Sequence, residues 1–181
     1  MLRPMLASVF AVLAAGVQII PRLPQPAVKY VATPQSLVDG MLALARVTST
    51  DIVYDLGSGD GRIPITAALK FGARGVGIEI DTFYLRSAYD NLKKAGVGDR
   101  VRFLNQDLFT ADIHDATVIT LFLLPQVNQR LMPKLKREAQ PGARVVSHLY
   151  DMGAEWPPDQ SQEIEGAMIY LWTIRGGPAL K

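Results

Sequence analysis

The chain contains no cysteine and only two histidines, and both shortages limit the chemistry that it can perform. Without cysteine there is no disulfide, no thiolate nucleophile and no cysteine-rich metal or iron–sulfur site. His114 and His148 are too few for a typical zinc site, so we expect no metal. The chain also has no long run of one charge, and its net charge is only +2. This charge distribution gives no reason to expect a nucleic-acid partner.

A glycine-rich segment is the most informative feature that the sequence does contain. An apolar run, Ile52–Tyr54, leads into Asp55 and then into glycine at every second position, Gly57, Gly59 and Gly61. This order predicts a buried strand that ends in a tight loop, where the backbone passes close to a ligand. Apolar residues at helical spacing follow the loop. The segment is therefore expected to form a strand, a glycine loop and a helix.

A second predicted strand, Gly75–Ile80, carries Glu79 near its end. In doubly wound α/β sheets the carboxyl ends of such strands share one edge, where nucleotides bind. A dinucleotide site has the spacing G-x-G-x-x-G, whereas this loop has G-x-G-x-G with Asp55 ahead of it and Asp60 inside it. Two carboxylates would repel a pyrophosphate but suit a ligand with an ammonium and a sulfonium. S-adenosylmethionine has both, and a nicotinamide cofactor is disfavoured.

The rest of the chain alternates predicted helices and strands, which indicates one α/β domain. Helices are expected from Thr33-Pro34, from Asp81 or Thr82 to Gly96, and around Val127 with an interruption near Pro133. The remaining strands are expected at 101–104, 116–123, 143–147 and 169–174.

Three pieces of this pattern resemble class I S-adenosylmethionine-dependent methyltransferases. Asp55–Gly61, Glu79 and Asp107 look like motifs I, II and III of that superfamily, and the match runs from about Tyr30 to Arg175. Within it, the chain most resembles the protein-lysine methyltransferases that act on the membrane-embedded c subunit of ATP synthase, and their prokaryotic relatives. Ala32 departs from that family, where we expect proline. The closer resemblance is carried by Tyr30–Thr33, Gly57–Ile63, Leu124–Gln126 and Trp156–Asp159.

The resemblance implies a Rossmann-like, doubly wound α/β sheet that is mostly parallel and has an antiparallel C-terminal strand. It implies a protein-lysine N-methyltransferase that uses S-adenosyl-L-methionine to methylate a membrane protein by in-line transfer. Two alternatives stay open. One is a soluble enzyme that methylates a small molecule or RNA, and the other is a non-catalytic module that binds S-adenosylmethionine.

The resemblance also implies roles for particular residues. Asp55 would lie near the cofactor's ammonium, Glu79 would accept from the ribose hydroxyls, and Asp107 would accept from the adenine amine. A helix cap after a strand is the alternative role for Asp107. The residues expected to bind the cofactor are Thr33, Asp55, Gly57, Ser58, Gly59, Gly61, Glu79, Asp107 and Leu108.

The acceptor is expected to enter beside Leu121–Gln126, at the end of the fourth predicted strand. The Asn/Asp-Pro-Pro-aromatic motif of adenine and glutamine methylases is absent there, which disfavours those acceptors. Leu121 and Leu123 are expected in the core. The residues expected to face the substrate are Tyr30, Pro125, Gln126 and Trp156, although Trp156 could pack on the sheet instead. No catalytic base is assigned, because His148 and Tyr150 both suit an ordinary loop role.

The sequence divides into an apolar leader at 1–21, a proline-rich connector at 22–34 and a methyltransferase domain at 35–181. The apolar part, Met5–Ile20, is shorter than the roughly 20 residues of a comfortable bilayer span. A membrane anchor, a signal peptide and an apolar docking helix all fit it. The family resemblance favours an anchor that holds the domain at the cytoplasmic side of a membrane. Export and a soluble cytoplasmic location are the alternatives.

Overall fold

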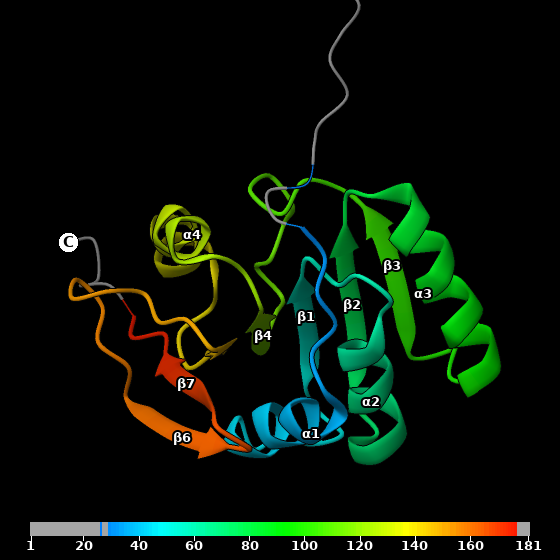
Figure 1. Cartoon of the computed structure of the whole chain (residues 1–181), viewed down its shortest axis with the longest axis horizontal. Coiled ribbons are helices and arrows are strands. Elements are labelled where there is room, and N and C mark those ends of the chain that lie inside the picture. Colours follow the sequence, from blue (N-terminus) through cyan, green and yellow to red (C-terminus); the bar gives the residue numbers. More distant parts are fainter. Residues whose placement is uncertain (1–25, 27–28, 177–181) are drawn as a thin grey trace, which may run out of the picture.

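The protein forms an α/β fold around one seven-stranded sheet (Figure 1). The structure is a computed structural model that describes residue 26 and residues 29–176. The predicted leader therefore lies outside the described residues. The strands are β1 Ile52–Leu56, β2 Arg74–Glu79, β3 Val101–Asn105, β4 Val118–Leu121, β5 Arg144–His148, β6 Gln160–Ile164 and β7 Ala167–Thr173.

The strand order is β3-β2-β1-β4-β5-β7-β6. Strands β1 to β5 are parallel, whereas β7 pairs antiparallel with β5 and β6 pairs antiparallel with β7. The expected sheet, mostly parallel with an antiparallel C-terminal strand, is confirmed. The chain builds β2 and β3 on one side of β1 and then continues with β4 on the other side. Such a reversal leaves a crevice at the carboxyl ends of the two central strands.

Helices cover both faces of the sheet because neighbouring residues of its strands point to opposite faces. The helices are α1 Gln35–Leu44, α2 Arg62–Phe71, α3 Thr82–Ala95 and α4 Pro125–Glu138. In β1, Val53 packs in the cluster that contains Leu37 of α1 and Ile63 of α2. Its neighbour Tyr54 packs in the opposite cluster with Leu131 of α4.

The ends of α3 agree with the sequence pattern. The Asp81 side chain accepts a hydrogen bond from the backbone N–H of Phe83 at 2.8 Å and so caps the first turn. Gly96 ends the helix in the left-handed conformation with φ of 68°. The start of α3 fixes the turn after β2, which carries Asp81 and Glu79 to the edge of the sheet.

The predicted interruption of α4 near Pro133 is wrong, because the helix continues through the proline. Proline removes the N–H that would bond the carbonyl of Gln129, four residues earlier. Pro133 and Gln129 are both exposed, so water can reach this turn. Leu131 and Leu135, which are fully buried, hold the other side of the helix against the sheet. Packing of the apolar face therefore outweighs one lost hydrogen bond.

Two strands differ from the sequence expectation. β6 was not predicted, because its residues are mostly polar and exposed and it pairs only with β7. The fourth strand was expected at 116–123 but spans only Val118–Leu121. Phe122 and Leu123 therefore leave the sheet at its carboxyl edge, where both line a cavity.

We expect Gly77→Ala to destabilise the fold, because β2 passes too close to its neighbours at this residue. An ideal Cβ on Gly77 would lie 2.4 Å from Phe103 Cδ1 and 2.6 Å from Ser58 Oγ. Overpacking of this kind costs about 1–3 kcal/mol in the free energy of unfolding. Urea denaturation should show that loss for Gly77→Ala and under about 0.5 kcal/mol for Gly98→Ala, whose Cβ would meet nothing within 4 Å. Equal stability of the two variants would contradict the packing described here.

Candidate functional site

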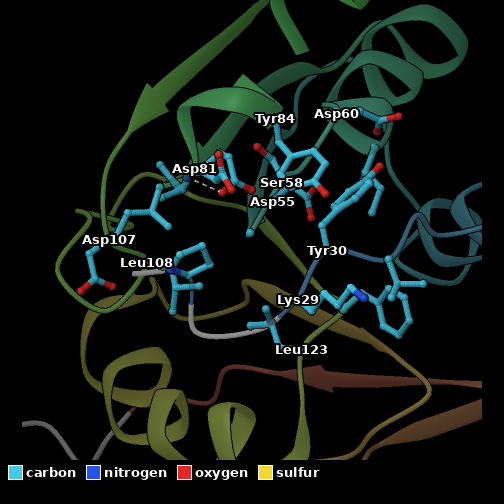
Figure 2. A pocket seen from close by; sticks show the side chains of 18 of the residues that line it. Lys29, Tyr30, Asp55, Ser58, Asp60, Asp81, Tyr84, Asp107, Leu108 and Leu123 are labelled. Atoms are coloured by element: carbon cyan, nitrogen blue, oxygen red, sulfur yellow. Dashed lines mark hydrogen bonds between the residues drawn. The ribbon is translucent and has the colours of Figure 1, made fainter. Parts of the chain in front are cut away.

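A cavity of about 470 Å³ opens at the carboxyl ends of β1, β2 and β4 (Figure 2). Its size is in the usual range for a small-molecule site. The glycine loop, the turn after β2, the segments after β3 and β4, and the connector before α1 all reach it. Many of its side chains are acidic or aromatic. The carboxylates that line it belong to Asp55, Asp60, Glu79, Asp81 and Asp107.

Glu79 joins the glycine loop to the turn after β2. Its Oε2 accepts a hydrogen bond from the backbone N–H of Gly59, and its Oε1 accepts from the N–H of Asp81, both at 2.8 Å. The side chain is buried but still lines the cavity. Because each carboxylate oxygen can accept more than one hydrogen bond, Glu79 keeps acceptor capacity for hydroxyl groups of a ligand. The predicted ribose-binding role requires this capacity.

Asp55 is the last residue but one of β1 and is only 4% exposed. Burial, together with the nearby carboxylates of Glu79 and Asp60, raises the pKa of its carboxyl to about 7. A hydrogen bond from Thr120 Oγ1 at 2.7 Å acts in the opposite direction. A buried carboxyl of this kind ionises more easily when a cation binds beside it. It is therefore suited to a ligand that carries an ammonium group.

Asp60 is held differently, by an ion pair at the start of α2. Arg62 donates from Nε to Oδ1 at 2.9 Å and from Nη2 to Oδ2 at 2.7 Å. Burial opposes ionisation of Asp60, but the guanidinium holds the pKa of its carboxyl below the ordinary value. Arg62 also donates from Nη1 to the backbone carbonyl of Thr33 at 2.8 Å. The same arginine thus ties the connector to the glycine loop.

Tyr30 covers the glycine loop from the connector side. Its ring lies 4.2 Å from that of Tyr84, centroid to centroid, and both rings line the cavity. An ideal Cβ on Gly59 would lie 2.0 Å from Tyr30 Cε2, and Gly59 has φ of +52°. Burial raises the pKa of the Tyr30 hydroxyl, and the Asp60 carboxylate adds to that shift. Glycine at position 59 therefore allows an aromatic ring to close over the loop.

Asp107 and Leu108 follow β3 and close the other side of the cavity in Figure 2. Asp107 Oδ1 accepts a hydrogen bond from the backbone N–H of Phe109 at 2.9 Å, so this carboxylate caps a turn, whereas the alternative weighed for it was a helix cap. Its position on the cavity wall still allows its other oxygen to meet a ligand amine. Contact between Asp107 and the adenine amine stays a prediction.

The predicted cofactor residues fall into two groups. Thr33, Asp55, Gly57, Ser58, Glu79, Asp107 and Leu108 line the cavity. Gly59 lies under Tyr30, and a Cβ on Gly61 would lie 2.3 Å from Phe103 Cζ, so these two glycines shape the loop by packing. The buried Ser58 Oγ has no hydrogen-bond partner among the described residues, which leaves one polar atom free at the loop.

Of the residues predicted to face the substrate, fewer line the cavity than of those predicted to bind the cofactor. Tyr30 lines the cavity, whereas Pro125, Gln126 and Trp156 are not part of its wall. Trp156 packs on the sheet, as its ring lies 5.7 Å from that of Trp172 and its carbonyl accepts from Trp172 Nε1 at 2.8 Å. Leu123 is both buried, as expected, and part of the cavity wall. After β4 the wall is thus formed by Phe122 and Leu123, ahead of the predicted Pro125 and Gln126.

His148 is buried at the end of β5, with its ring 3.9 Å from that of Phe122 between centroids. Burial lowers the pKa of its imidazole, and its Nδ1 has no partner among the described residues. Phe122 lines the cavity, but neither His148 nor Tyr150 does. We therefore assign the role of proton acceptor to neither residue.

Several cavity residues were not predicted from the sequence. Tyr84 lies in the first turn of α3. It could have been predicted, because this turn directly follows β2 at the edge of the sheet where the cavity lies. Arg130 comes from α4, and its guanidinium lies 3.7 Å from the centre of the Phe109 ring. Lys29 comes from the connector, next to Tyr30. No local pattern marks Arg130 or Lys29, because tertiary packing brings them to the site.

The donor set of the cavity fits S-adenosylmethionine. Asp55 offers a buried carboxyl for the ammonium, Glu79 offers acceptors for ribose hydroxyls, and Leu108 with Ile80 offers apolar surface for a purine. Several carboxylates surround the space and would stabilise a sulfonium. The cofactor supplies a methyl group on positively charged sulfur, and the residues named here would hold and orient it.

The chain is similar to known methyltransferases over most of its length. A family model described as the ANTKMT methyltransferase domain matches residues 55–160. A protein-lysine N-methyltransferase from Saccharolobus islandicus is 46% identical over 154 residues, which cover 82% of this chain and 95% of that protein. The lysine N-methyltransferase for the ATP synthase c subunit of Xenopus laevis is 33% identical over 141 residues, or 78% of this chain and 61% of that protein. The chain thus spans about three fifths of this animal relative.

Among solved structures, one from Salinibacter ruber is 54% identical and superposes with a TM-score of 0.80. The match covers 83% of this chain and 98% of the other, which is described as an RNA methyltransferase in complex with S-adenosyl-L-homocysteine.

We expect Glu79→Gln to weaken S-adenosylmethionine binding by about 10- to 100-fold, because an amide offers only one acceptor oxygen and no charge. Isothermal titration calorimetry measures the affinity directly. Glu163→Gln, at an exposed glutamate of β6, is the matched control and should bind as wild type does. Unchanged affinity in Glu79→Gln would show that the cofactor does not use this carboxylate.

Proposed function

The chain belongs to the ANTKMT methyltransferase-domain family and is an S-adenosylmethionine-dependent methyltransferase, and we propose that its acceptor is the side-chain amine of a protein lysine. The observation that carries this proposal is the charge of the cavity. Five carboxylates line it, against three basic side chains, Lys29, Arg62 and Arg130. The charge of Arg62 is already paired with that of Asp60. A negative cavity attracts a cationic lysine and disfavours the phosphates of a nucleic acid.

The shape of the acceptor side supports the same proposal. Phe122 and Leu123 form a wall after β4, and the rings of Tyr30 and Tyr84 lie against each other at the cavity. Lysine carries a charged amine on a long apolar stem, which packs well along such surfaces. The carboxylates of the cavity would attract the charged end as the lysine enters.

Methyl transfer to an amine needs positioning more than covalent help from the enzyme. The lysine must lose its proton so that the nitrogen lone pair can attack the methyl carbon in line with the departing sulfur. Apolar surroundings favour the neutral amine by lowering its pKa. The proton leaves to solvent before the amine is enclosed, and Tyr30, Phe122 and Leu123 would then provide these apolar surroundings.

The names of the relatives agree with a lysine acceptor. The Saccharolobus islandicus and Xenopus laevis proteins are both named lysine N-methyltransferases. The frog protein is named for the c subunit of ATP synthase, which supports the finer proposal that the acceptor here is a small membrane protein.

We also propose that the domain works at a membrane, on the cytoplasmic side, through the apolar residues 1–21. Its support is the sequence of that segment, which lies outside the described residues. Within the part of the chain that the structure describes, no helix is long and apolar enough to cross a membrane. An exported or soluble enzyme is the alternative.

RNA is the second candidate acceptor, because the Salinibacter ruber structure is described as an RNA methyltransferase. Its 54% identity to this chain makes that description relevant. Against it stand the carboxylates of the cavity, since RNA-binding sites gather basic groups.

Transfer of labelled methyl groups from S-adenosylmethionine to separated membrane and soluble extracts tests the proposal. We expect label that survives ribonuclease, disappears with protease and is recovered as methyl-lysine. Asp55→Ala should lower the labelling by at least about 10-fold, because it removes the buried carboxyl that faces the cofactor. Asp90→Ala, at an exposed position of α3, is the matched control and should label normally.

The distribution of the label separates the candidates. A small labelled membrane protein would support the membrane acceptor as well as the lysine. Methyl-lysine only in soluble proteins would contradict the membrane acceptor and keep the lysine. Label that ribonuclease removes would contradict the lysine and favour RNA.

A further inference from the structure

The cavity contains a lysine of the chain itself. Lys29 lies in the connector, directly before Tyr30, and lines the same cavity as Asp55 and Glu79. We propose that Lys29 is an acceptor in cis, so that the enzyme methylates its own connector. This inference rests on the proposed lysine-methyltransferase function and adds a modification site to it.

The backbone that follows Lys29 is fixed at the site. Tyr30, its direct neighbour, packs its ring on that of Tyr84 and over Gly59. Three residues after Tyr30, the carbonyl of Thr33 accepts a hydrogen bond from Arg62. These contacts with the glycine loop and the start of α2 tether Lys29 to the cavity. Such tethering gives an intramolecular acceptor a high effective concentration.

Lys29 shares the cavity wall with Phe122 and Leu123, from the segment beside which the acceptor is expected to enter. In Figure 2 the Lys29 side chain is drawn below Tyr30, and Asp107 lies on the opposite side of the view. All five residues line the cavity. The predicted adenine end and the lysine thus occupy different parts of the same space. Because Lys29 and the carboxylates expected to bind the cofactor line one cavity, the Lys29 amine would have to reach the methyl group within that cavity.

The Lys29 ammonium is also free to react. Among the residues that the structure describes, it has no salt-bridge partner within 4.0 Å. The other cations of the cavity are engaged, Arg62 with Asp60 and Arg130 with the Phe109 ring. Both are guanidiniums, which stay protonated and are poor nucleophiles. Lys29 is the lysine in the described cavity wall that can supply a nitrogen lone pair.

The chemical step is the same as for a lysine in another protein. Lys29 Nζ first loses a proton to water, and its lone pair then forms the N–C bond while the methyl carbon–sulfur bond breaks. S-adenosylhomocysteine leaves with the sulfur electrons, and the methylated amine carries the positive charge. Two repetitions, each with the loss of one more proton, give a trimethylammonium, which has no lone pair left. Its charge persists beside Tyr30 and suits a cation–π contact.

Mass spectrometry of the purified full chain tests the proposal. After incubation with S-adenosylmethionine and no other protein, the peptide that contains residue 29 should gain one to three methyl groups. Asp55→Ala protein should stay unmodified, and Lys29→Arg should remove most of the self-labelling. Lys70→Arg is the matched control, because Lys70 pairs with Asp39 on α1 and does not line the cavity. The Lys70 variant should label at position 29 as wild type does.

A dilution series distinguishes reaction in cis from reaction between molecules. The fraction of Lys29 methylated per unit time should stay constant over a 100-fold dilution, whereas a rate proportional to protein concentration would overturn the proposal. An assay of extract proteins, run in parallel, separates the two hypotheses. Methyl-lysine in extract proteins with an unmodified Lys29 would overturn only this inference. Absence of methyl-lysine in both would count against the lysine-methyltransferase function itself.

Discussion

The site depends on the burial of two carboxylates where parallel strands end. Asp55 and Glu79 are 4% and 7% exposed, at the ends of β1 and β2. Burying carboxylates is costly unless they are hydrogen-bonded or neutralised. Glu79 meets this cost with backbone N–H groups of Gly59 and Asp81, whereas Asp55 has one hydroxyl partner and a pKa of about 7. The cost of burying an ionised carboxylate is therefore not fully offset at Asp55, and a cation bound beside it would offset the rest.

This electrostatic requirement connects the fold to the proposed function. The strand order puts Asp55, Glu79 and Phe122 around one cavity, although they come from three different strands or strand ends. A sulfonium cofactor and a lysine acceptor are both cations before reaction. Tyr30 closes the same space from the connector and brings Lys29 with it. One acidic cavity thus suits donor, acceptor and self-modification alike.

Much of the cofactor side of the cavity could be predicted from local sequence, because the local backbone geometry there restricts which residues fit. The glycine loop and the Gly96 helix end follow from backbone requirements that few residues meet. Glu79 follows from its place at the end of a predicted strand, at the edge where parallel strands meet. The sequence pattern was less informative where packing decided the outcome. β6 lacks an apolar face, and Pro133 lies on an exposed turn that tolerates a lost hydrogen bond. Contacts made only in the folded chain placed Trp156 against Trp172 and brought Lys29 to the cavity.

Proton release on cofactor binding tests the central claim, that Asp55 is the buried carboxyl which a bound cation ionises. Calorimetric titration with S-adenosylmethionine, in buffers of different ionisation enthalpy, gives the number of protons released. With a pKa of about 7 for Asp55, wild type should release about 0.9 proton more than Asp55→Asn at pH 6. At about pH 8.5 this difference should almost vanish, because Asp55 is then ionised before the cofactor binds. Equal proton release by wild type and Asp55→Asn at pH 6 would contradict the account.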